Sequence, residues 1–357
     1  MIPPMDDRTP LVGLSTAQLR EWAHDALGEP AYRGAQLSKW IYRKAATDFE
    51  QMTDLPTTLR ARLRDRAVVS PNAISLTQRS KDGTVKCLLR LADGNEVECV
   101  LLPYEERVSV CLSTQVGCAM GCRFCATAQG GYTRNLDAGE IVDQLLHLQR
   151  LSERRISHVV LMGMGEPLLN LEQVVQALRL MHEELEISYR RITVSTVGIA
   201  PKIYALAQYR LPITLAISLH APDDETRARI MPVSRKWGVE TLIQAAHDYF
   251  ETTKRRVTFE YLLLREVNDT TKHAEQLAQQ LKGKPCLVNL IPFNYVPTLD
   301  GFQRPEAERV RRFRQILEAA GIETTQRVER GHDIAAACGQ LRGNHRGKPI
   351  PLAAQTR

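Results

Sequence analysis

Hydrophobic and polar residues change their spacing twice along this chain of 357 residues. Residues 1–70 follow the 3.6-residue period of amphipathic helices. The pattern predicts three helices, over residues 15–27, 33–44 and 59–66. Ser15 and Gln18 form a capping-box signal at the start of the first helix, and Gly28 stands where that helix is expected to end. This part of the chain is therefore expected to form a small helical domain.

Residues 71–107 change to the two-residue period of β-strands. Three strands are predicted, over residues 73–76, 84–91 and 97–102, and the turn signals at residues 82–83 and 93–95 join them as hairpins. One carboxylate, Glu98, interrupts the apolar run of the third strand. The pattern alone favours a Glu98 that faces solvent. The alternative is a side chain that points into a site, where burial raises its pKa and makes it a base.

From residue 108 to about residue 330, predicted strands and helices alternate. The six predicted strands cover residues 108–113, 158–162, 191–195, 213–218, 257–263 and 287–291. Helices are predicted between them, over residues 138–151, 171–185, 203–208, 239–252 and 271–281. Repeated βα units form parallel sheets with right-handed crossovers, and six units are fewer than the eight of a closed barrel. We therefore expect an α/β fold built on a partial (β/α)6 barrel that is open on one side.

The complete expected organisation has four parts. Residues 1–70 form the small N-terminal helical domain, and residues 71–107 form a short antiparallel β extension that carries Glu98. Residues 108–330 form the partial barrel. Residues 331–357 form a C-terminal loop with a basic tail.

Composition and charge indicate where the protein is located in the cell but do not identify its function. Apolar residues make up 43% of the chain, but no run reaches the roughly 18 apolar residues of a membrane-spanning helix. The first residues lack the basic and apolar regions of a signal peptide. We therefore expect a cytoplasmic protein with no membrane partner. The net charge of +6 is compatible with a nucleic-acid partner and is only weak support for one.

The most specific chemical signal is a loop with three cysteines, Cys118, Cys122 and Cys125, in a C-x3-C-x2-C spacing. Thiolates are soft ligands that suit iron–sulfur clusters or zinc. A closed structural zinc site needs a fourth ligand, whereas a cubane cluster on three cysteines leaves one iron open for a small molecule. Core thiols and a zinc site completed by a distant side chain are the alternatives. We favour the cluster because a short loop with a glycine is poorly suited to bury three thiols as core residues.

Other polar or glycine-containing motifs follow the predicted strands at their C-terminal ends, where parallel barrels place their active sites. These motifs are at residues 163–167, 195–198, 218–220 and 292–294. A single one of them reads most simply as a local cap or a packed residue, but four beside a cysteine loop predict one site. In the first motif, Gly165 permits close approach of a ligand, and Glu166 is suited to pair with an ammonium group.

Five further cysteines lie outside the loop. Cys111 precedes the loop by seven residues, and Cys338 lies among small residues near the C-terminus, in a stretch suited to a flexible loop. From the sequence alone, each reads more simply as a small buried residue than as a nucleophile. Cys87 and Cys286 are expected in the core, and Cys99 has no assigned role.

Taken together, these motifs resemble the RlmN family, the bacterial dual-specificity RNA adenine-C2 methyltransferases of the radical S-adenosylmethionine (SAM) superfamily. The resemblance covers nearly the whole chain and is carried by the motifs at residues 32–37, 52–56, 97–100, 114–118, 124–129, 163–167, 218–221 and 333–341. The related C8 methyltransferases of antibiotic resistance share the cluster, both outer thiols and the Ser-Leu-His motif. Residues 126–131 and 165–167 look closer to the C2 enzymes. Further alternatives are a glycyl-radical activator and an RNA-binding protein with a structural cluster.

The resemblance implies a mechanism that uses SAM twice per turnover, because C2 of adenine is too electron-poor to attack a methyl group directly. Cys338 would take a methyl group from one SAM. A [4Fe-4S] cluster on the three loop cysteines would reduce a second SAM, and the resulting 5′-deoxyadenosyl radical would activate the methyl group for addition to C2. Glu98 would remove the C2 proton. Cys111 would release the product by forming a transient disulfide with Cys338, which an external reductant resets.

The same resemblance implies the remaining partners. The residues expected to hold SAM are Gly165, Glu166, Ser195, Ser218, Leu219, His220 and Asn294. The expected substrates are an adenosine of large-subunit ribosomal RNA, before full assembly, and the adenosine beside the anticodon of some transfer RNAs. Candidate RNA contacts are the basic and aromatic helices of the first domain and the basic stretches at residues 254–256, 309–314 and 345–348, each of which equally suits a solvated surface. An external electron donor and a monomeric enzyme are also expected.

Overall fold

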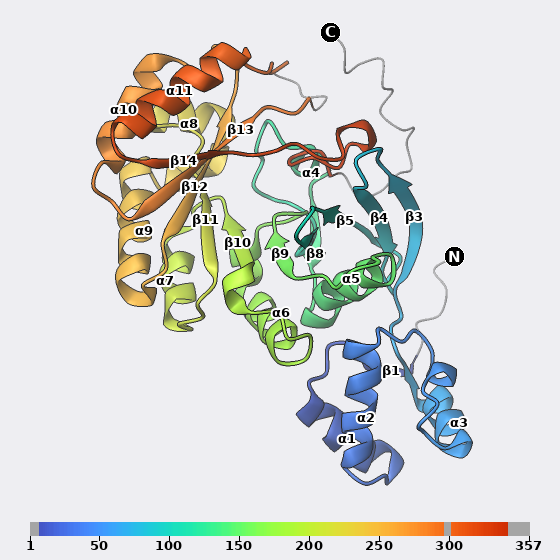
Figure 1. The fold of residues 1–357 in the computed structure, drawn as a ribbon. Coiled ribbons are helices and arrows are strands. Elements are labelled where there is room, and N and C mark those ends of the chain that lie inside the picture. Colours follow the sequence, from blue (N-terminus) through green and yellow to red (C-terminus); the bar gives the residue numbers. More distant parts are fainter. Residues whose placement is uncertain (1–6, 296–300, 342–357) are drawn as a thin grey trace.

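A ten-stranded sheet runs through the protein in the computed structural model, which describes residues 7–295 and 301–341 (Figure 1). The strands lie in the order β14–β13–β12–β11–β10–β9–β6–β5–β4–β3. Their bounds are β3 (Ala73–Arg79), β4 (Val85–Arg90), β5 (Glu96–Pro103), β6 (Val108–Cys111), β9 (His158–Leu161), β10 (Ile192–Thr196), β11 (Thr214–Ser218), β12 (Val257–Leu263), β13 (Cys286–Pro292) and β14 (Glu323–Gln326). Two short pairs stand apart from this sheet: β1 (Thr9–Pro10) with β2 (Ala67–Val68), and β7 (Gln115–Gly117) with β8 (Tyr132–Asn135).

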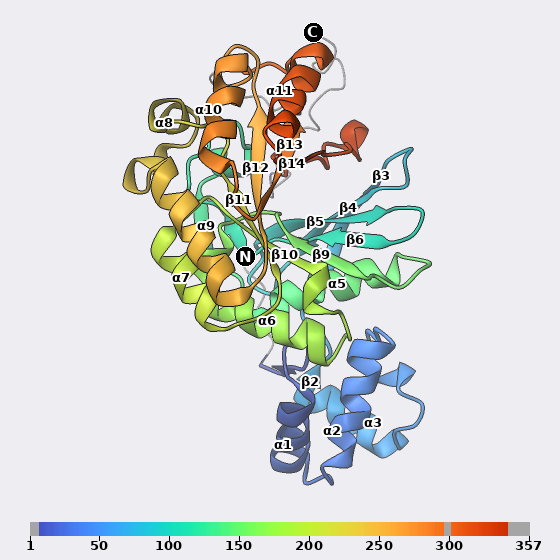
Figure 2. The same cartoon turned by 60° about the vertical axis from the view of Figure 1, so that its left-hand side comes forward.

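The structure has eleven α-helices in its described part, of which α5 to α11 alternate with the parallel strands and lie along the outside of the curved sheet (Figure 2). Their bounds are α1 (Thr16–Leu27), α2 (Tyr32–Ser38), α3 (Thr57–Arg66), α4 (Ala126–Gln129), α5 (Ala138–Arg150), α6 (Leu171–Glu183), α7 (Ala200–Gln208), α8 (Asp224–Ile230), α9 (Val239–Thr253), α10 (Thr271–Leu281) and α11 (Ala307–Ala319). None of the helices in the described part of the chain is both long enough and apolar enough to cross a membrane.

Parallel pairing runs without a break from β6 through β9–β13 to β14 and confirms the predicted partial barrel. The sequence pattern did not predict β14, because this edge strand is polar and buries only Thr324. It also missed α8 and α11. The latter was recognised only as a basic stretch, yet Val310, Phe313 and Leu317 bury one side of it at the spacing of a helix.

The antiparallel strands β3, β4 and β5 extend the barrel sheet instead of forming a sheet of their own. β5 pairs antiparallel with β6, the first barrel strand, and places Val100 opposite Cys111. β4 pairs in turn with β5 and places Lys86 opposite the same Val100. This pairing satisfies the backbone groups that an unpaired edge of β6 would expose, and it joins the extension rigidly to the barrel.

The N-terminal helices form a separate group at one end of the molecule (Figure 1). The predicted capping box of α1 is present between Ser15 and Gln18, and Gly28 ends that helix in the left-handed conformation. The second predicted helix differs: its α-helical part ends at Ser38 and the chain continues as one π-helical turn over Lys39–Arg43.

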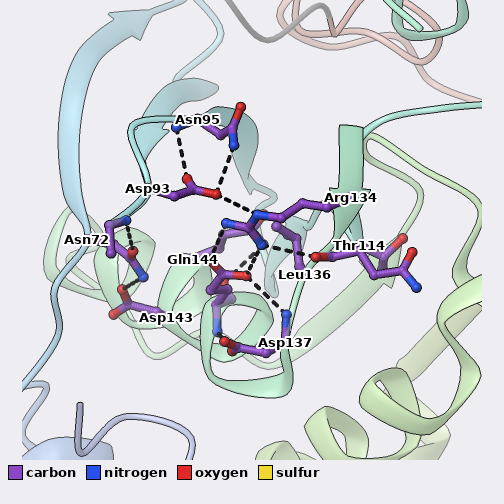
Figure 3. A network of polar contacts seen from close by, with 12 residues as sticks. Asn72, Asp93, Asn95, Thr114, Arg134, Leu136, Asp137, Asp143 and Gln144 are labelled. Carbon is purple, nitrogen blue, oxygen red and sulfur yellow. Dashed lines mark hydrogen bonds and ion pairs between the residues drawn. The ribbon is translucent and has the colours of Figure 1, made fainter. Parts of the chain in front are cut away.

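A polar network fixes the strand that follows the cysteine loop (Figure 3). Arg134 of β8 donates two hydrogen bonds of 2.8 Å to the carboxylate of Glu140 on α5, and a third of 2.6 Å to Asp93 in the β4–β5 turn. Glu140 also forms the capping box of α5 with Asp137. Bidentate arginine–carboxylate pairs hold their geometry well, so β8 fixes the position of the C-terminal end of the cysteine loop.

Candidate active site

The C-terminal ends of the parallel strands surround a cavity of about 180 Å³. The cavity lining includes most residues that the sequence predicted for the site: Cys111, Cys118, Cys122, Cys125, Gly165, Glu166, Ser195, Ser218, His220, Asn294 and Cys338. These residues are far apart in the sequence but meet because most of them end or follow strands of one parallel sheet. Glu98 and Leu219, which were also predicted for the site, are not part of this lining.

The loop that carries Cys118, Cys122 and Cys125 spans residues 118–131 and is called the cluster loop below. Strands β7 and β8 pair at its two ends, and Cys118 N–H donates a 2.7 Å hydrogen bond to the carbonyl of Gly131. Gly117 has φ +77°, and a Cβ atom there would lie 2.0 Å from that same carbonyl oxygen. Only glycine fits this closure, so the base of the loop is constrained by sterics as well as by hydrogen bonds.

Burial raises the pKa of each cluster-loop thiol, that of Cys118 to about 12. Mutual repulsion among the three thiols raises the pKa values of Cys118 and Cys122 further. Thiols of this kind become thiolates only when a strong cationic centre binds them. Among the described residues, no three His, Cys, Asp or Glu side chains are grouped as the ligands of one metal ion. Three soft thiol donors on one short loop fit an iron–sulfur cluster.

The motif after β9 packs closely against the chain itself. A Cβ atom at Gly163 would lie 2.7 Å from the backbone of Leu112, and one at Gly165 would lie 2.6 Å from the side chain of Gln115. These contacts explain both glycines by internal packing, a reason that the sequence argument did not contain. They also bring Gly165 and Glu166 to the cavity wall beside the cluster loop.

Glu166 is buried, and backbone N–H groups hold its carboxylate. Leu168 N–H donates to one oxygen at 3.0 Å, and Val197 N–H donates to the other at 2.8 Å. Burial nevertheless raises the pKa of Glu166 to about 7, against the opposing effect of these hydrogen bonds. A buried carboxylate with free lone pairs is a suitable partner for an ammonium group that enters the cavity.

Asn294 offers an independent indication of a bound ligand. Its side-chain oxygen is buried at the cavity wall and has no hydrogen-bond partner among the described residues. A buried amide oxygen without a partner costs about 1–3 kcal/mol, and a polar ligand would remove that cost. Ser195 and Ser218 add hydroxyl groups to the same wall. Three thiols, a buried carboxylate, an unpaired amide and two hydroxyls fit an iron–sulfur cluster together with a polar amino-acid ligand.

His220 enters the site in a fixed tautomer. Its Nδ1 accepts a 3.0 Å hydrogen bond from the N–H of Leu262, so the neutral ring carries its proton on Nε2. Burial lowers the pKa of His220 to about 3, and the nearby guanidinium of Arg227 acts in the same direction. The ring also packs edge-on against Phe124 of the cluster loop, with centroids 5.1 Å apart. His220 is therefore a neutral packing and hydrogen-bonding group, not a proton donor at neutral pH.

Arg227, which the sequence argument missed, holds the ends of two strands. Its guanidinium is fully buried and donates to the carbonyls of Val197, Ser218 and Leu219 at 2.6, 3.0 and 3.0 Å. Leu219 itself packs in the hydrophobic core and does not reach the cavity. The Ser-Leu-His motif therefore contributes Ser218 and His220 to the cavity wall, while Leu219 packs into the hydrophobic core behind that wall.

Cys338 reaches the cavity on the C-terminal segment, defined here as residues 331–341, which lies beside α4 (Figure 1). The carbonyl of Gly339 accepts a 2.8 Å hydrogen bond from Ala126, and the carbonyl of Leu341 accepts one of 2.6 Å from the hydroxyl of Thr127. Both partners follow directly after the last cysteine of the cluster loop. The segment is therefore docked against the cluster loop and is not a free tail.

Cys111 and Cys338 occupy the same region of the cavity. Burial, followed by the proximity of Cys338, raises the pKa of Cys111 to about 12. Arg327, just after β14, approaches both thiols and places Nη1 3.6 Å from the sulfur of Cys338. Cys338 raises the pKa of the Arg327 guanidinium more than any other group does. The two thiols and one cation thus lie close together at the cavity wall.

Glu98 is fully buried, in contrast to the solvent-facing position that the strand pattern favoured. Its carboxylate lies 3.1 Å from Nζ of Lys86, which is also buried. Along β5, Glu98 shares a face with Val100 and Leu102, and Leu102 lines the cavity. The side chain is therefore on the cavity side of the sheet, although it is not part of the lining itself.

Glu260 and Asn289 are further site residues that sequence reasoning missed. Asn289 of β13 donates a 2.8 Å hydrogen bond to Glu260 of β12, and Glu260 lines the cavity. Burial raises the pKa of Glu260, and Arg327 opposes that effect. The available signal was the same as for Glu98, namely one polar residue inside an otherwise apolar strand.

The basic stretches proposed as RNA contacts lie in different places. Residues 254–256 precede β12 and therefore lie at the end of the barrel opposite the cavity, where Lys254 pairs with Glu251 and Arg256 with Glu323. Residues 309–314 lie on α11, and three of their arginines pair with neighbouring carboxylates. Residues 345–348 lie outside the described part of the chain.

The aromatic residues of the N-terminal helices are more accessible. Tyr32 is largely exposed, and the guanidinium of Arg33 lies 4.8 Å from its ring centre. The ammonium group of Lys44 lies 3.4 Å from the ring centre of Trp40. Such paired cations and rings can stack on bases and neutralise phosphates.

Comparison with known proteins identifies the family. The profile of the Radical SAM superfamily matches residues 112–278, and that of the ribosomal RNA large subunit methyltransferase N-terminal domain matches residues 9–69. A "Probable dual-specificity RNA methyltransferase RlmN" of Symbiobacterium thermophilum is 50% identical, over 96% of this chain and 93% of its own. The corresponding protein of Rhodopirellula baltica is 48% identical, over 94% of this chain and 91% of its own.

A solved structure supports the same assignment. The crystal structure of a radical SAM methyltransferase from Sphaerobacter thermophilus superimposes with a TM-score of 0.90 at 46% identity, and the match covers 94% of this chain and 99% of that one. The chain therefore belongs to the RlmN family of radical SAM RNA methyltransferases, enzymes that use a [4Fe-4S] cluster and SAM.

Proposed function

We propose that this enzyme methylates C2 of adenosine in 23S ribosomal RNA and in transfer RNA, through an S-methylcysteine formed on Cys338. One observation carries the proposal: Cys111 and Cys338 line the same cavity as the three cysteines of the cluster loop. A radical SAM enzyme needs only the three loop thiols to hold its cluster. Two additional thiols at the cavity wall are what a methyl carrier and a resolving group require.

In the first step, the sulfur of Cys338 attacks the methyl group of SAM and displaces the thioether. The attacking species is the thiolate, because a neutral thiol is a poor nucleophile. Arg327 supports this state, since its guanidinium lies 3.6 Å from the sulfur of Cys338. The small residues Ala336, Ala337 and Gly339 around Cys338 leave room for the methyl group and for the substrate.

In the second step, the methylated sulfur of Cys338 becomes the point of attachment to RNA. The cysteines of the cluster loop would hold the cluster, and with SAM it would supply the one-electron chemistry that this step needs: hydrogen-atom removal from the S-methyl group and withdrawal of one electron once the methylene is joined to C2 of adenine. The side chains Glu166, Ser195, Ser218 and Asn294 are proposed to orient SAM for this purpose, and Glu98 is proposed to remove the C2 proton.

In the third step, Cys111 releases the product. Its thiolate attacks the sulfur of Cys338, the bond between that sulfur and the methylene breaks, and the methylene takes a proton to become the methyl group. The two thiols end as a disulfide, which an external two-electron reductant returns to the thiol state. The position of both thiols at one cavity wall supports this role for Cys111.

The remaining parts of the proposal concern RNA and the division of the chain. Residues 1–70 are proposed as an RNA-contacting domain, and exposed Tyr32 with neighbouring Arg33 supports this. Residues 71–107 would present Glu98, residues 108–330 would hold cluster and SAM, and residues 331–357 would present Cys338. The enzyme would act as a monomer in the cytoplasm, where ribosomal and transfer RNAs are made and modified.

The test is anaerobic reconstitution with SAM that carries a deuterated methyl group, followed by mass spectrometry of a Cys338 peptide and of digested RNA. We expect label on Cys338 before RNA is added and 2-methyladenosine in both RNA classes afterwards. Formation of 8-methyladenosine would instead assign the enzyme to the C8 reaction. Normal RNA methylation by Cys338→Ala would refute the methyl-carrier role.

A matched variant separates the two outer thiols from the cluster. Cys111→Ala should still label Cys338 and should accumulate an RNA–protein adduct that resists denaturation. Cys286→Ala removes a buried thiol outside the cavity and serves as the control, with methylation products as in the unsubstituted enzyme. Loss of iron from Cys118→Ala, Cys122→Ala or Cys125→Ala would test cluster ligation by a separate readout.

A further inference from the structure

A buried ion pair lies beside the cavity on the strands of the antiparallel extension. Lys86 and Glu98 are 4% and 0% exposed, and their charged atoms are 3.1 Å apart. Removing two charges from water costs several kcal/mol, so such a pair contributes little to stability by itself. Apolar residues of similar size would fill the same space at lower cost. Its presence next to an active site points to a functional role for the lysine.

The register of three strands places this pair on the side of the sheet that carries Cys111. Lys86 of β4 lies opposite Val100 of β5, and Val100 lies opposite Cys111 of β6. Partners across a sheet share a face, and residues two apart on one strand share it too. Glu98, two residues before Val100, therefore lies on the same face as Lys86 and Cys111.

Lys86 also contacts the C-terminal segment. Its Nζ donates a 3.1 Å hydrogen bond to the carbonyl of Ala335, three residues before Cys338. Other contacts between the β3–β4 hairpin and this segment involve its first residues: Ser80 donates to Asp333 at 2.5 Å, and Gly331 N–H donates to Asp82 at 2.9 Å. Those contacts dock the segment without touching Glu98. Lys86 is the side chain that contacts both the carboxylate and the segment that carries Cys338.

We propose that Lys86 is a positioning residue, whose ammonium group holds the Glu98 carboxylate in place for proton removal and ties that placement to the docked position of the Cys338 segment. This inference rests on the proposed role of Glu98 as the base. With the segment docked, the lysine holds the carboxylate on the cavity side of β5 at the moment when the adduct forms on Cys338. Without Lys86, the carboxylate loses the ammonium group that lies 3.1 Å away and links it to the Cys338 segment.

In the covalent adduct, C2 of adenine carries both a hydrogen and the methylene attached to the sulfur of Cys338. Glu98 takes that hydrogen as a proton, and the electron pair of the C–H bond returns to the purine ring, which becomes aromatic again. The proton stays on the carboxyl group of Glu98, and this step needs no further oxidant. Only afterwards does Cys111 attack the sulfur of Cys338.

The test compares Lys86→Met with Glu98→Gln under single-turnover, anaerobic conditions. Three quantities are measured: S-methylation of Cys338 by peptide mass, the RNA–protein adduct by denaturing gel electrophoresis, and 2-methyladenosine by digestion of the RNA. In both variants we expect normal S-methylation, an accumulating adduct, and product release slowed on the order of 100-fold, the scale of a general-base contribution. The dissociation constant for RNA should stay unchanged in Lys86→Met, because the effect is on a step after binding.

Two further variants exclude a merely structural effect. Lys81→Met makes the same substitution at an exposed lysine of the same hairpin and should behave as the unsubstituted enzyme. Lys86→Arg retains the cation and should restore part of the rate of adduct breakdown.

The possible outcomes distinguish a failure of the Lys86 role from a failure of the proposed base role of Glu98. If Glu98→Gln accumulates the adduct while Lys86→Met does not, the inference about Lys86 is wrong and the base is retained. If Glu98→Gln releases product at the normal rate, both the base role and the inference fail. If Lys86→Arg releases product no faster than Lys86→Met, or if Lys86→Met already fails at S-methylation, the lysine acts on structure and the inference is overturned.

Discussion

Nη1 of Arg327 lies 3.6 Å from the sulfur of Cys338 and 3.6 Å from the thioether sulfur of Met162. The guanidinium therefore bridges the C-terminal segment and the turn after β9. Its charge is partly shielded from water, and a cation in such surroundings favours the thiolate of a neighbouring cysteine. Glu260, also near Arg327, balances part of the charge from the opposite side.

We expect Arg327→Gln to slow the methylation of Cys338 by about tenfold, because the substitution removes the cation that lies 3.6 Å from the attacking sulfur, and an activation barrier raised by roughly 1.4 kcal/mol corresponds to that factor. The rate is measured as mass gain on a Cys338 peptide after mixing with SAM in the absence of RNA. Arg311→Gln, on the exposed side of α11, is the matched control and should react at the normal rate. An unchanged rate in Arg327→Gln would show that this cation does not activate the thiol.

The closure of the cluster loop depends more on Gly117 than on Gly121. Gly117→Ala should destabilise the loop by roughly 3 kcal/mol or more, because positive φ and a 2.0 Å clash with the Gly131 carbonyl act together. Gly121→Ala in the same loop meets no atom within 4 Å and carries only the strain of φ +67°, about 1–2 kcal/mol.

Iron content after anaerobic reconstitution measures this difference. Gly117→Ala should retain less than half of the iron and sulfide of the unsubstituted protein, and Gly121→Ala should retain nearly all of it. Equal iron contents in the two variants would mean that the β7–β8 closure does not control cluster assembly.

The sequence predicted the arrangement of the barrel better than the limits of its sheet. The βα periodicity of residues 108–291 was sufficient because buried parallel strands leave strong apolar runs. Strand β14 lacks such a run, since at the edge of the sheet only Thr324 is buried. The joining of β5 to β6 was also missed, because hydrogen bonds between strands leave no trace in the hydrophobic pattern of either strand.

For the active site, the motifs located the cavity-lining residues but not the groups that support them. Cys118 and His220 lie at strand ends, where barrel topology makes the prediction possible. Arg227 and Arg327 are supporting cations whose partners are backbone carbonyls and a thiol distant in the sequence, so only the folded chain reveals them. Glu98 was ambiguous for a similar reason, because its buried partner Lys86 is on another strand.

The raised pKa of Glu166 predicts a dependence of stability on pH. A carboxyl group that titrates near 4.5 when unfolded and near 7 when folded binds more protons in the folded state between those values. The free energy of unfolding of the SAM-free protein should therefore decrease as the pH rises from 4.5 through 7, by on the order of 3 kcal/mol in full. Below pH 4.5 the contribution is fully present.

Denaturant unfolding at pH 5 and pH 7.5 measures this change in the free energy of unfolding, and Glu166→Gln should lose most of the pH dependence. In the same window the affinity for SAM should change in the opposite direction, because the ionised carboxylate is the form that pairs with an ammonium group. An identical pH dependence in Glu166→Gln and in the unsubstituted protein would rule out Glu166 as the titrating group.

One buried carboxylate that helps to attach the N-terminal helices to the barrel is Glu184, which follows α6. It accepts hydrogen bonds of 2.6 Å from both the backbone N–H and the hydroxyl of Thr16, and one of 2.8 Å from the hydroxyl of Ser38. Glu184→Ala leaves these donors without their acceptor and should weaken the attachment by roughly 2–4 kcal/mol. Glu186→Ala is the matched control, because its surface pairs with Arg43 and Arg155 contribute about 0–1 kcal/mol.

Limited proteolysis and RNA binding together test this attachment. Glu184→Ala should be cleaved faster between the helices and the barrel, and it should bind RNA at least tenfold more weakly, because a loosely held domain must be ordered when RNA binds. Methylation of Cys338 by SAM needs no RNA and should proceed at the normal rate in both variants. If Glu184→Ala binds RNA normally although it is cleaved faster, the fixed orientation of residues 1–70 does not contribute to RNA recognition.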